Sequence, residues 1–527
     1  MSAWKYLISS FFAICTIRLL TNIVTENAVK VLRYDYMKPV GSTAKSNKLI
    51  SMGRELLKKF TPLKQSFAKE QEELAQLVLC IYRQTSNNAT TNLDRCNVKD
   101  RVNFLLNGLE NISTQVLSPD VDVLAEEVRK YTAQKIHELQ NPTDCGRARL
   151  LECTLAVPCG YGGMTWHFVA CINLGIALNR TVIFSGTRKP MKEYFSMFQP
   201  ITASCNNITT SSCDKVLNIS EGLALANETC LTYTMRMQLP SDIVNLAYSV
   251  PYDIFPLISA FNSKPYIWWN GQITSFVMRP KAWLNEFIEN KRKRLLGRQP
   301  IVGVHIRRTD KHDKHPVSTY MIHVENWWQK YEQQQQLLGR NISSVRRVYV
   351  ATDEPEVVPE VKQKYPNYNV SHNEEGTKHA STTDRWSSLG AQGLITDVYL
   401  LSKCDFVICG LTSNVCRLVF DLMQSIHTDA SSRLFSVDKS YNAVLTEVKT
   451  KNRYIATMDH VAQPGSIELD MKRGDVLNIN EPKRVYGKKK AFVPGYYSMN
   501  DVVNNKTGLV PSYKAKPFPR ISPIPFL

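Results

Sequence analysis

The 527-residue chain lacks any paired Cys-x-x-Cys motif, although it contains thirteen cysteines. Seven of them crowd into one segment, and this density is more typical of disulfides in an oxidising compartment than of a zinc site. Because the count is odd, at least one thiol stays unpaired, and Cys15 is a candidate. The crowded cysteines are Cys145, Cys153, Cys159, Cys171, Cys205, Cys213 and Cys230.

The N-terminal segment lacks an apolar run of the roughly 20 residues that a membrane-spanning helix needs. Twelve mostly apolar residues, 6–17, lie between Lys5 and Arg18, and a looser apolar trend continues to Val24. We interpret residues 1–24 as a signal-anchor in which Arg18 is tolerated. A cleaved signal with a site near Ala13 or Cys15 fits the same pattern. Both interpretations place the remainder in the lumen of the secretory pathway.

Asn-x-Ser/Thr sequons support that placement, because they matter only in a chain that enters the secretory pathway. Nine are present, some of them expected by chance, and they begin at Asn88, Asn111, Asn179, Asn207, Asn218, Asn227, Asn341, Asn369 and Asn505.

The basic residues lack the aromatic interleaving of a nucleic-acid patch. A formal net charge of +18 indicates an anionic partner, such as a nucleic acid, a membrane surface or a phosphorylated small substrate. The densest run, 291–294, follows an amphipathic stretch that includes Trp283 and Ile288, as the solvated end of a helix would. We therefore expect no nucleic-acid partner.

Residues 25–142 lack a sustained heptad repeat. From about residue 42 onward this segment is rich in Glu, Lys, Gln and Leu, and its apolar residues recur at helical spacing, as at Leu124, Val128 and Tyr131. The pattern predicts a helical stem and leaves homodimerisation through it open. Pro142 and Cys145 mark its end.

Beyond that boundary, short apolar runs alternate with helical patterns. The expected strands cover 181–184, 301–306, 347–351 and 405–409, and the expected helices cover 357–365 and 394–402. Such alternation predicts an α/β region with a largely parallel sheet over residues 143–448. Ligands of these sheets gather beyond the carboxyl ends of the strands. The residues that follow the expected strands therefore carry most weight: 307–311, Asp353, Glu354 and Ser413.

Residues 449–516 change character to the strand-and-turn pattern of an SH3-like β-barrel, through 454–456, 467–477 and 507–513. No tryptophan occurs after Trp386, so this module lacks the aromatic wall that grips a polyproline ligand. We interpret it as a packing or substrate-contacting module, with a peptide adaptor as the alternative. Residues 517–527 form a tail.

The run from Gly303 to Lys311 carries the strongest functional signal. An adjacent pair of arginines, Arg307 and Arg308, leaves the end of an expected buried strand. Guanidinium pairs suit bidentate binding of phosphates, whereas a solvated basic loop is the plainer interpretation of the pair alone. His305, Asp310 and Lys311 beside them favour a site.

Several motifs in order resemble the α-1,6-fucosyltransferases that modify the core of N-glycans, a family with a Rossmann-like, GT-B-related catalytic region. The resemblance covers about 145–513 and makes residues 143–448 the catalytic region, behind the helical stem and ahead of the SH3-like barrel. Its motifs are at 144–145, 159–162, 268–269, 279–284, 305–311, 349–355, 365–368, 397 and 409–417.

The resemblance implies an inverting, metal-independent enzyme of the Golgi membrane, with type II topology and a lumenal catalytic region. Its donor would be GDP-fucose, and its acceptor the 6-hydroxyl of the innermost GlcNAc of an N-glycan. Arg307 and Arg308 would bind the pyrophosphate in place of a metal, with help from Ser413 and the backbone of 160–162, that is Gly160, Tyr161 and Gly162. His305 and Asp397 would bind guanine. Plainer roles remain open, His305 as a core residue and Asp397 as a helix cap.

The acceptor side follows the family less closely. By resemblance Asp353 and Glu354 face the acceptor, although a cap for the next helix fits them too. The family's glutamate four residues after Lys311 is missing, and Asp313 is the nearest acid in a shortened loop. Asp313, oriented by Lys311, or else His315 would serve as the base. Alternatively, the chain is a catalytically impaired relative that binds nucleotide or glycan as a partner of another enzyme.

Other departures also mark a divergent member. Gly163 stands where the family has a cysteine, and Phe492 where it has an acceptor-contacting histidine. The family pattern implies the disulfides Cys145–Cys205, Cys153–Cys171 and Cys409–Cys416. It assigns no partner to Cys80, Cys96, Cys159, Cys213 or Cys230.

Overall fold

The computed structural model describes most of residues 119–438 and shorter stretches on either side. Contacts divide the chain into two units. Residues 47–53, 119–438, 522 and 526 belong to one, here called the sheet-pair unit, and residues 55 and 453–521 to the other. Within these limits, the undescribed residues are 156–158, 186–192, 194–195, 206–212, 214, 218–227, 236–245, 299, 311–313, 338, 341–344, 382–383, 457–458, 463–467, 473–474, 480–495, 502–505, 512–513 and 518–520.

The smaller sheet of the sheet-pair unit has three parallel strands, in the order β2-β1-β3. They are β1 (Leu150–Leu155), β2 (Thr181–Ser185) and β3 (Cys230–Met235). Helix α5 (Tyr161–Leu178) connects β1 to β2, and nearly all of its residues are buried. A helix that is apolar on every side must be covered on every side. It therefore lies in the core of this half.

The larger sheet is parallel throughout and has the order β7-β6-β5-β8-β9. Its strands are β5 (Val302–Ile306), β6 (Arg347–Thr352), β7 (Asn369–His372), β8 (Phe406–Cys409) and β9 (Leu434–Ser436). The order reverses between β5 and β8, the switch point at which doubly wound sheets bind ligands. The α/β prediction is confirmed, and the strands expected near 181, 301, 347 and 405 are all present within one residue of the expected bounds.

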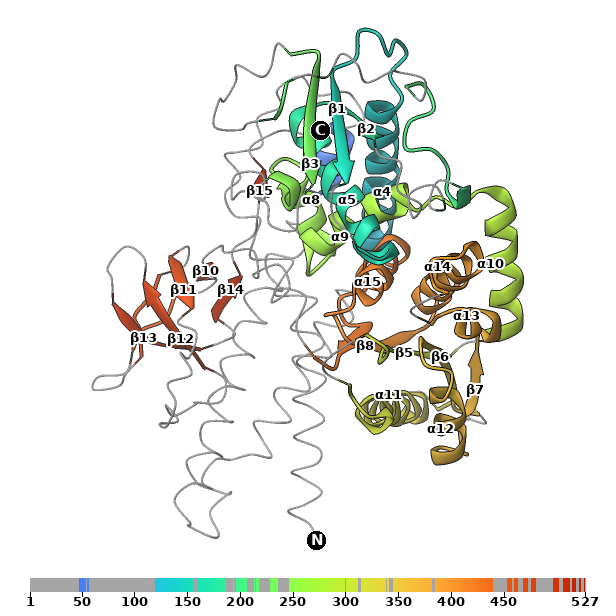
Figure 1. The fold of residues 1–527 in the computed structure, drawn as a ribbon. Coiled ribbons are helices and arrows are strands. Elements are labelled where there is room, and N and C mark those ends of the chain that lie inside the picture. Colours follow the sequence, from blue (N-terminus) through green and yellow to red (C-terminus); the bar gives the residue numbers. More distant parts are fainter. Residues whose placement is uncertain are drawn as a thin grey trace. The chain divides into compact units, whose positions relative to one another are not determined.

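Helices cover both faces of the larger sheet (Figure 1). On one face lie α11 (Val317–Leu337) and α12 (Val357–Lys364), whose apolar residues share one core with β5 and β6. On the other face lies α14 (Ser388–Ser402), which begins six residues before the expected helix. Its start is fixed by Ser387, whose hydroxyl accepts a hydrogen bond from the Gly390 N–H at 3.0 Å.

The two halves of the sheet-pair unit meet through α9 (Pro265–Val277) and α15 (Asn414–Ile426). Gly271 allows this close approach, because a Cβ there would lie 2.4 Å from the backbone oxygen of Asp421. The fully buried Asp421 carboxylate accepts hydrogen bonds from Asn270 Nδ2 at 2.7 Å and from Thr274 Oγ1 at 3.3 Å. Backbone proximity and buried polar contacts together define this α9–α15 joint.

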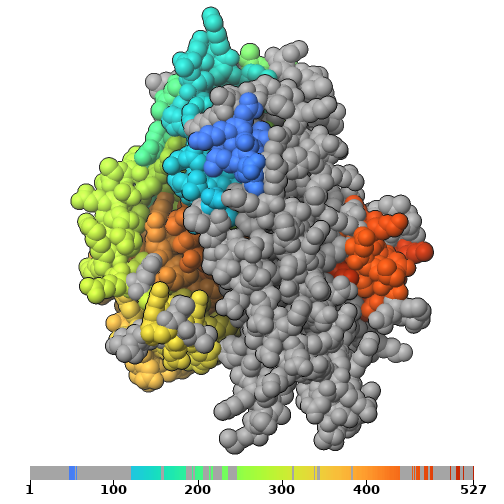
Figure 2. Space-filling view, turned by 180° about the vertical axis from the view of Figure 1, so that it is seen from behind, coloured from blue at the N-terminus to red at the C-terminus, as the bar shows by residue number. Residues whose placement is uncertain are grey.

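Residues 119–140, expected within the stem, pack into the sheet-pair unit. They form α4 (Pro119–Gln140), which contacts α8 (Phe255–Phe261) and α9 and buries Leu124, Val128 and Tyr131. The helical residues 47–53 belong to the same unit and form the blue patch of Figure 2, beside the cyan surface that begins at α4. The remainder of the predicted stem, and with it any stem dimer, lies outside the described residues.

Two further helices and the short strand β4 (Val250–Pro251) complete the sheet-pair unit. Helix α10 (Ala282–Leu295) forms where the amphipathic stretch predicts it, and α13 (Glu374–Lys378) packs on α14. The short strand β15 (Ile521–Ser522) spans the sequence boundary between the two units. From the predicted tail, the Phe526 ring packs edge-on against Trp269.

The second unit contains a five-stranded antiparallel sheet in the order β13-β12-β11-β10-β14. Its strands are β10 (Arg453–Ala456), β11 (Val476–Ile479), β12 (Tyr496–Asp501), β13 (Thr507–Pro511) and β14 (Ala515–Pro517). Buried side chains such as Leu477, Met499 and Val510 give it a core of its own. The sheet lies where the sequence predicts an SH3-like barrel, and its assignment to that fold stays a prediction.

The structure contains the three disulfides that the resemblance implies, Cys145–Cys205, Cys153–Cys171 and Cys409–Cys416. It also pairs Cys213 with Cys230, which the sequence had left without partners. No helix among the described residues is long and apolar enough to cross a bilayer. The predicted signal-anchor, residues 1–24, lies outside them.

Candidate active site

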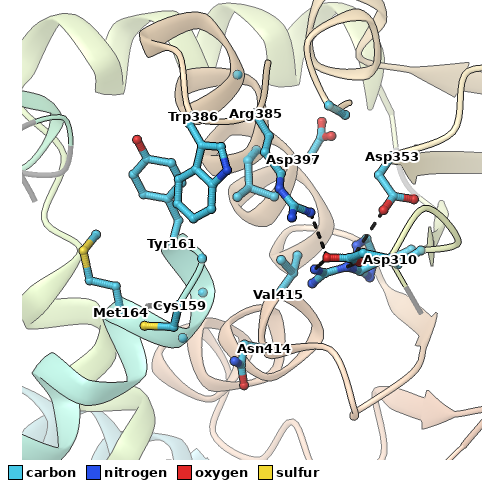
Figure 3. Close-up of a pocket in the computed structure, with 18 of the residues that line it drawn as sticks. Cys159, Tyr161, Met164, Asp310, Asp353, Arg385, Trp386, Asp397, Asn414 and Val415 are labelled. Atoms are coloured by element: carbon cyan, nitrogen blue, oxygen red, sulfur yellow. Dashed lines mark hydrogen bonds and ion pairs between the residues drawn. The ribbon is translucent and has the colours of Figure 1, made fainter. Parts of the chain in front are cut away.

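A cavity of about 770 Å³ opens at the switch point of the larger sheet. This volume is in the range that small-molecule sites occupy. Its wall combines the ends of β1, β5 and β6 with the first turns of α5 and α15 and with the segment that leads into α14 (Figure 3). The described residues that line it are Leu155, 159–164, His305, Arg307, Asp310, Thr352, Asp353, Gly376, Ala380, Arg385, Trp386, Gly390, Leu394, Asp397, Thr412, Asn414 and Val415.

Two helix N-termini meet at this cavity, those of α5 and α15. Gly162 permits the meeting, because a Cβ there would lie 3.0 Å from Asn414 Cβ and 3.1 Å from the Val415 nitrogen. The N–H groups of a first helical turn carry partial positive charge and bind phosphates readily. Gly160, Tyr161 and Gly162, predicted to assist in phosphate binding, all line this wall.

The predicted pyrophosphate ligand Arg307 enters the cavity from the end of β5. Its Nε and Nη2 donate to the two carboxylate oxygens of Asp310 at 2.9 and 2.8 Å. Its Nη1 lies 3.5 Å from the hydroxyl of the buried Ser413, the N-cap residue of α15. Ser413 thus contacts Arg307 but does not itself line the cavity, and its assistance in phosphate binding stays a prediction.

Asp310 holds a second guanidinium, that of Arg385 from the segment ahead of α14. Arg385 Nη1 donates to Asp310 Oδ2 at 2.9 Å. Hydrogen bonds from Arg307, reinforced by Arg385, lower the pKa of Asp310 to about 2 against the opposing effect of its partial burial. The Asp310 carboxylate is therefore ionised at any physiological pH.

Arg308 does not join Arg307 in the cavity, contrary to the sequence-based expectation. Its Nη1 pairs with Glu354 at 3.3 Å and Glu360 at 3.2 Å, and its Nε donates to the His315 backbone oxygen at 3.1 Å. Successive side chains of an extended segment point to opposite sides. Two adjacent arginines leaving one strand therefore face different surroundings, and Arg308 braces α12 and the loop after β5.

The predicted acceptor residues Asp353 and Glu354 also separate. Asp353 lines the cavity and accepts hydrogen bonds from the N–H groups of Arg308 and Thr309 at 2.9 and 3.4 Å, so it fixes the loop that carries Arg307. Glu354 pairs with Arg308 and is not among the lining residues.

His305 and Asp397, predicted to bind guanine, are both buried and both line the cavity. Asp397 accepts a hydrogen bond from the Tyr349 hydroxyl at 2.7 Å. Burial raises the pKa of Asp397 to about 7, although hydrogen bonds from Tyr349 and Asn373 and the charge of Lys291 act in the opposite direction. This carboxyl therefore changes its charge near neutral pH.

An aromatic pair faces the charged residues across the cavity. Figure 3 shows the Tyr161 and Trp386 rings on one side and Asp310 with Asp353 on the other. The two ring centroids lie 5.9 Å apart. Such a wall offers a planar surface on which a base or the apolar face of a sugar can pack.

The predicted base and its partner, Asp313 and Lys311, lie outside the described residues. The alternative base His315 is described. Its ring packs edge-on against Tyr320, with 6.4 Å between centroids, and it is not among the lining residues. Among the described residues, no cluster of His, Cys, Asp or Glu forms a metal site.

Arg385, Trp386 and the bridging position of Asp310 are parts of the site that the sequence did not predict. The adjacent Arg385 and Trp386 stand directly before a helix that carries a predicted ligand, Asp397. This position just before the helix could have indicated that the two side chains belong to the site. That they lie beside the end of β5 depends on long-range packing, which no local sequence pattern predicts.

The chain is similar in sequence to known fucosyltransferases. The family described as "Alpha-(1,6)-fucosyltransferase N- and catalytic domains" matches residues 21–442. An α-(1,6)-fucosyltransferase of Drosophila melanogaster is 29% identical over 398 residues, which cover 74% of this chain and 60% of that protein. One of Caenorhabditis elegans is 29% identical over 390 residues, covering 72% and 66%. The chain thus spans about three fifths to two thirds of these relatives.

The fold is also similar, loosely, to that of solved fucosyltransferases. The fucosyltransferase NodZ from Bradyrhizobium superposes with a TM-score of 0.29 at 13% identity, covering 52% of this chain and 92% of that chain. This superposition is too loose to place individual residues.

Proposed function

This chain belongs to the α-(1,6)-fucosyltransferase family, and we propose that it transfers fucose from GDP-fucose to the 6-hydroxyl of the innermost GlcNAc of N-glycans. One observation carries the proposal. The guanidinium groups of Arg307 and Arg385 and the N-termini of α5 and α15 converge on one cavity at the switch point of a doubly wound sheet. Such an arrangement suits a diphosphate with a nucleoside on one side and a sugar on the other, and this supports the proposal.

The proposed reaction is a single displacement with inversion. The acceptor oxygen bonds to C1 of fucose while the bond from C1 to the β-phosphate oxygen breaks, and the hydroxyl proton passes to a carboxylate base. Negative charge then develops on the leaving diphosphate. Fixed guanidinium groups and helix N-termini stabilise such charge without reorganisation, so we propose that the reaction needs no metal ion.

In this scheme guanine binds at His305 and Asp397. The N1–H and N2–H groups of guanine are donors, and an ionised carboxylate accepts both whereas a protonated one cannot. Tyr349 holds Asp397 in place through its 2.7 Å hydrogen bond. Guanine recognition therefore requires the deprotonated form of Asp397.

The affinity for GDP-fucose is expected to rise about tenfold between pH 6 and pH 8, because the Asp397 carboxyl, with its pKa of about 7, loses its proton across this range. Below pH 7 the protonated form prevails and binding weakens. Calorimetric titration of the protein with GDP-fucose, without acceptor, measures this change in affinity. The diphosphate of the donor keeps the same charge between pH 6 and pH 8, so it does not contribute to the change. Asp397→Asn should bind weakly with little pH dependence, and an equally steep rise in that variant would contradict the assignment.

The catalytic base is proposed to be Asp313, with Lys311 orienting it. Asp313→Asn is expected to lower the transfer rate at least a hundredfold, because general-base catalysis typically contributes 10²- to 10⁴-fold. Donor affinity should stay within about twofold. The measurement is product mass with a GlcNAc-terminated biantennary glycan, in EDTA, alongside GDP-fucose titration. Lys314→Gln, a change at an exposed position of the same loop, is the matched control.

The second candidate function is that of an impaired relative which binds nucleotide or glycan as a partner of another enzyme. The absence of the family's glutamate from the loop 311–316 favours it. Glycan transfer that disappears in Asp313→Asn would reject this alternative. Donor binding without transfer to any N-glycan would support it, whereas the absence of both binding and transfer would reject the fucosyltransferase proposal itself.

We propose that the chain works in the lumen of the Golgi as a type II membrane protein. Four disulfides in the sheet-pair unit support an oxidising compartment. Two of the sequon asparagines, Asn179 and Asn369, are described and exposed, as glycan attachment requires.

A further inference from the structure

Phosphate binding by a pair of guanidinium groups needs a second arginine, and Arg308 does not supply it. Its side chain is engaged by Glu354, Glu360 and the His315 backbone oxygen. Among the described lining residues, the guanidinium groups are those of Arg307 and Arg385. The two converge on one carboxylate, that of Asp310.

We propose that Arg385 is the second cation for the donor diphosphate and that Asp310 occupies both guanidinium groups until the donor arrives. This inference rests on the proposed function and deepens it. It replaces the adjacent pair predicted from the sequence with a pair drawn from two loops, one after β5 and one before α14.

The contacts of Arg385 fit a group that changes partners. It shares a single hydrogen bond with Asp310, whereas Arg307 holds the same carboxylate with two. Its Nε is buried and has no hydrogen-bond acceptor among the described residues. A buried donor without an acceptor is unfavourable, and a ligand oxygen would satisfy it. The guanidinium also lies 5.7 Å from the Trp386 ring centroid, which limits how far it can swing.

Asp310 suits the role of an internal anion. A carboxylate and a phosphate present similar pairs of oxygens to a guanidinium fork, so one can replace the other. The Asp310 and Arg385 side chains are 30% and 28% exposed, so this contact can open without uncovering an isolated buried charge. A diphosphate brings more charge and more acceptors than one carboxylate. Exchange toward the donor is therefore favourable.

The test compares GDP affinity in full-length variants by calorimetric titration. Arg385→Gln is expected to weaken GDP binding about 10- to 100-fold, the loss associated with one charge-assisted hydrogen-bonding group. Affinity for GMP, which lacks the β-phosphate, should fall less. Arg385→Lys should recover only part of the affinity, because a single ammonium lacks the fork. Asp310→Asn should bind GDP at least as tightly as the unmodified chain.

Variants of two further arginines distinguish the possible outcomes of this test. Arg308→Gln should change GDP affinity less than about threefold, and Arg346→Gln, at an ion-paired site outside the lining, reports the effect of losing one surface arginine. If Arg308→Gln weakens GDP binding more than Arg385→Gln does, the proposed pair is wrong. If Asp310→Asn loses tenfold or more in GDP affinity, Asp310 does not merely occupy the two guanidinium groups until the donor binds. If the unmodified chain does not bind GDP, the proposed function fails as well.

Discussion

Arg307→Lys is expected to lower kcat/KM for fucose transfer by about 10²- to 10³-fold, the loss seen when one fixed group that stabilises developing charge is removed. Lysine keeps the positive charge, but a single ammonium cannot present to the diphosphate the two parallel donors with which Arg307 holds Asp310 in the ligand-free structure. The ammonium would sit in several positions around the leaving diphosphate. Steady-state kinetics with GDP-fucose and a biantennary acceptor measures the effect.

Arg346→Lys is the matched control for this variant. Arg346 forms an equally well-defined set of ion pairs, with Glu325 at 2.7 Å and Glu332 at 2.8 Å, but it does not line the cavity. Its replacement should leave kcat/KM within about threefold. Comparable losses in both variants would show that the Arg307 effect reflects general loosening of the fold rather than the chemistry of the site.

Gly271→Ala is expected to reduce the free energy of unfolding by about 3 kcal/mol or more, the upper range for overpacking of a core. The added Cβ would lie 2.4 Å from the Asp421 backbone oxygen and 3.0 Å from Gln424 Cβ. Backbone cannot rotate out of the way as a side chain can, so α9 and α15 must separate. Separation also breaks the buried contact of Asn270 with Asp421, which leaves a buried carboxylate with fewer donors.

The midpoint of thermal or urea unfolding measures this loss. Alanine gains about 1 kcal/mol over glycine in helix propensity, so the substitution would stabilise an unconstrained helix. Asn290→Ala, at an exposed position of α10, reports a gain in helix propensity without overpacking and should raise the midpoint slightly. A midpoint for Gly271→Ala at or above that of the unmodified chain would show that the joint is looser than its geometry indicates.

Local patterns predicted the strands of the larger sheet well, because each is a short apolar run bounded by polar residues, as at 302–306 and 406–409. Parallel strands buried on both faces require such runs. Apolar spacing, which begins at Leu394, predicts a start for α14 that is six residues too late. The Ser387 cap, which lies outside that spacing, determines the start.

The candidate site was harder to predict where it depends on the direction of side chains and on segments far apart in the sequence. His305 and Arg307 stand in the run at the end of an expected strand, Asp397 follows from the family resemblance, and all three line the cavity. Arg308 was misplaced because adjacency in the sequence was taken as adjacency in the site. Arg385 enters from a segment 75 residues beyond its partner Asp310, a convergence that only tertiary packing creates.

The α9–α15 joint also determines how ligands come and go. Because its backbones touch at Gly271 and its polar contacts are buried, the two halves cannot rock apart there without exposing them. We therefore expect access to the cavity through movement at its rim, where Asp310 of the segment after β5 contacts Arg385 of the segment before α14. If the diphosphate holds Arg385 while GDP is bound, turnover would be timed by the return of Arg385 to Asp310 as GDP departs, with product release rather than bond formation as the slow step.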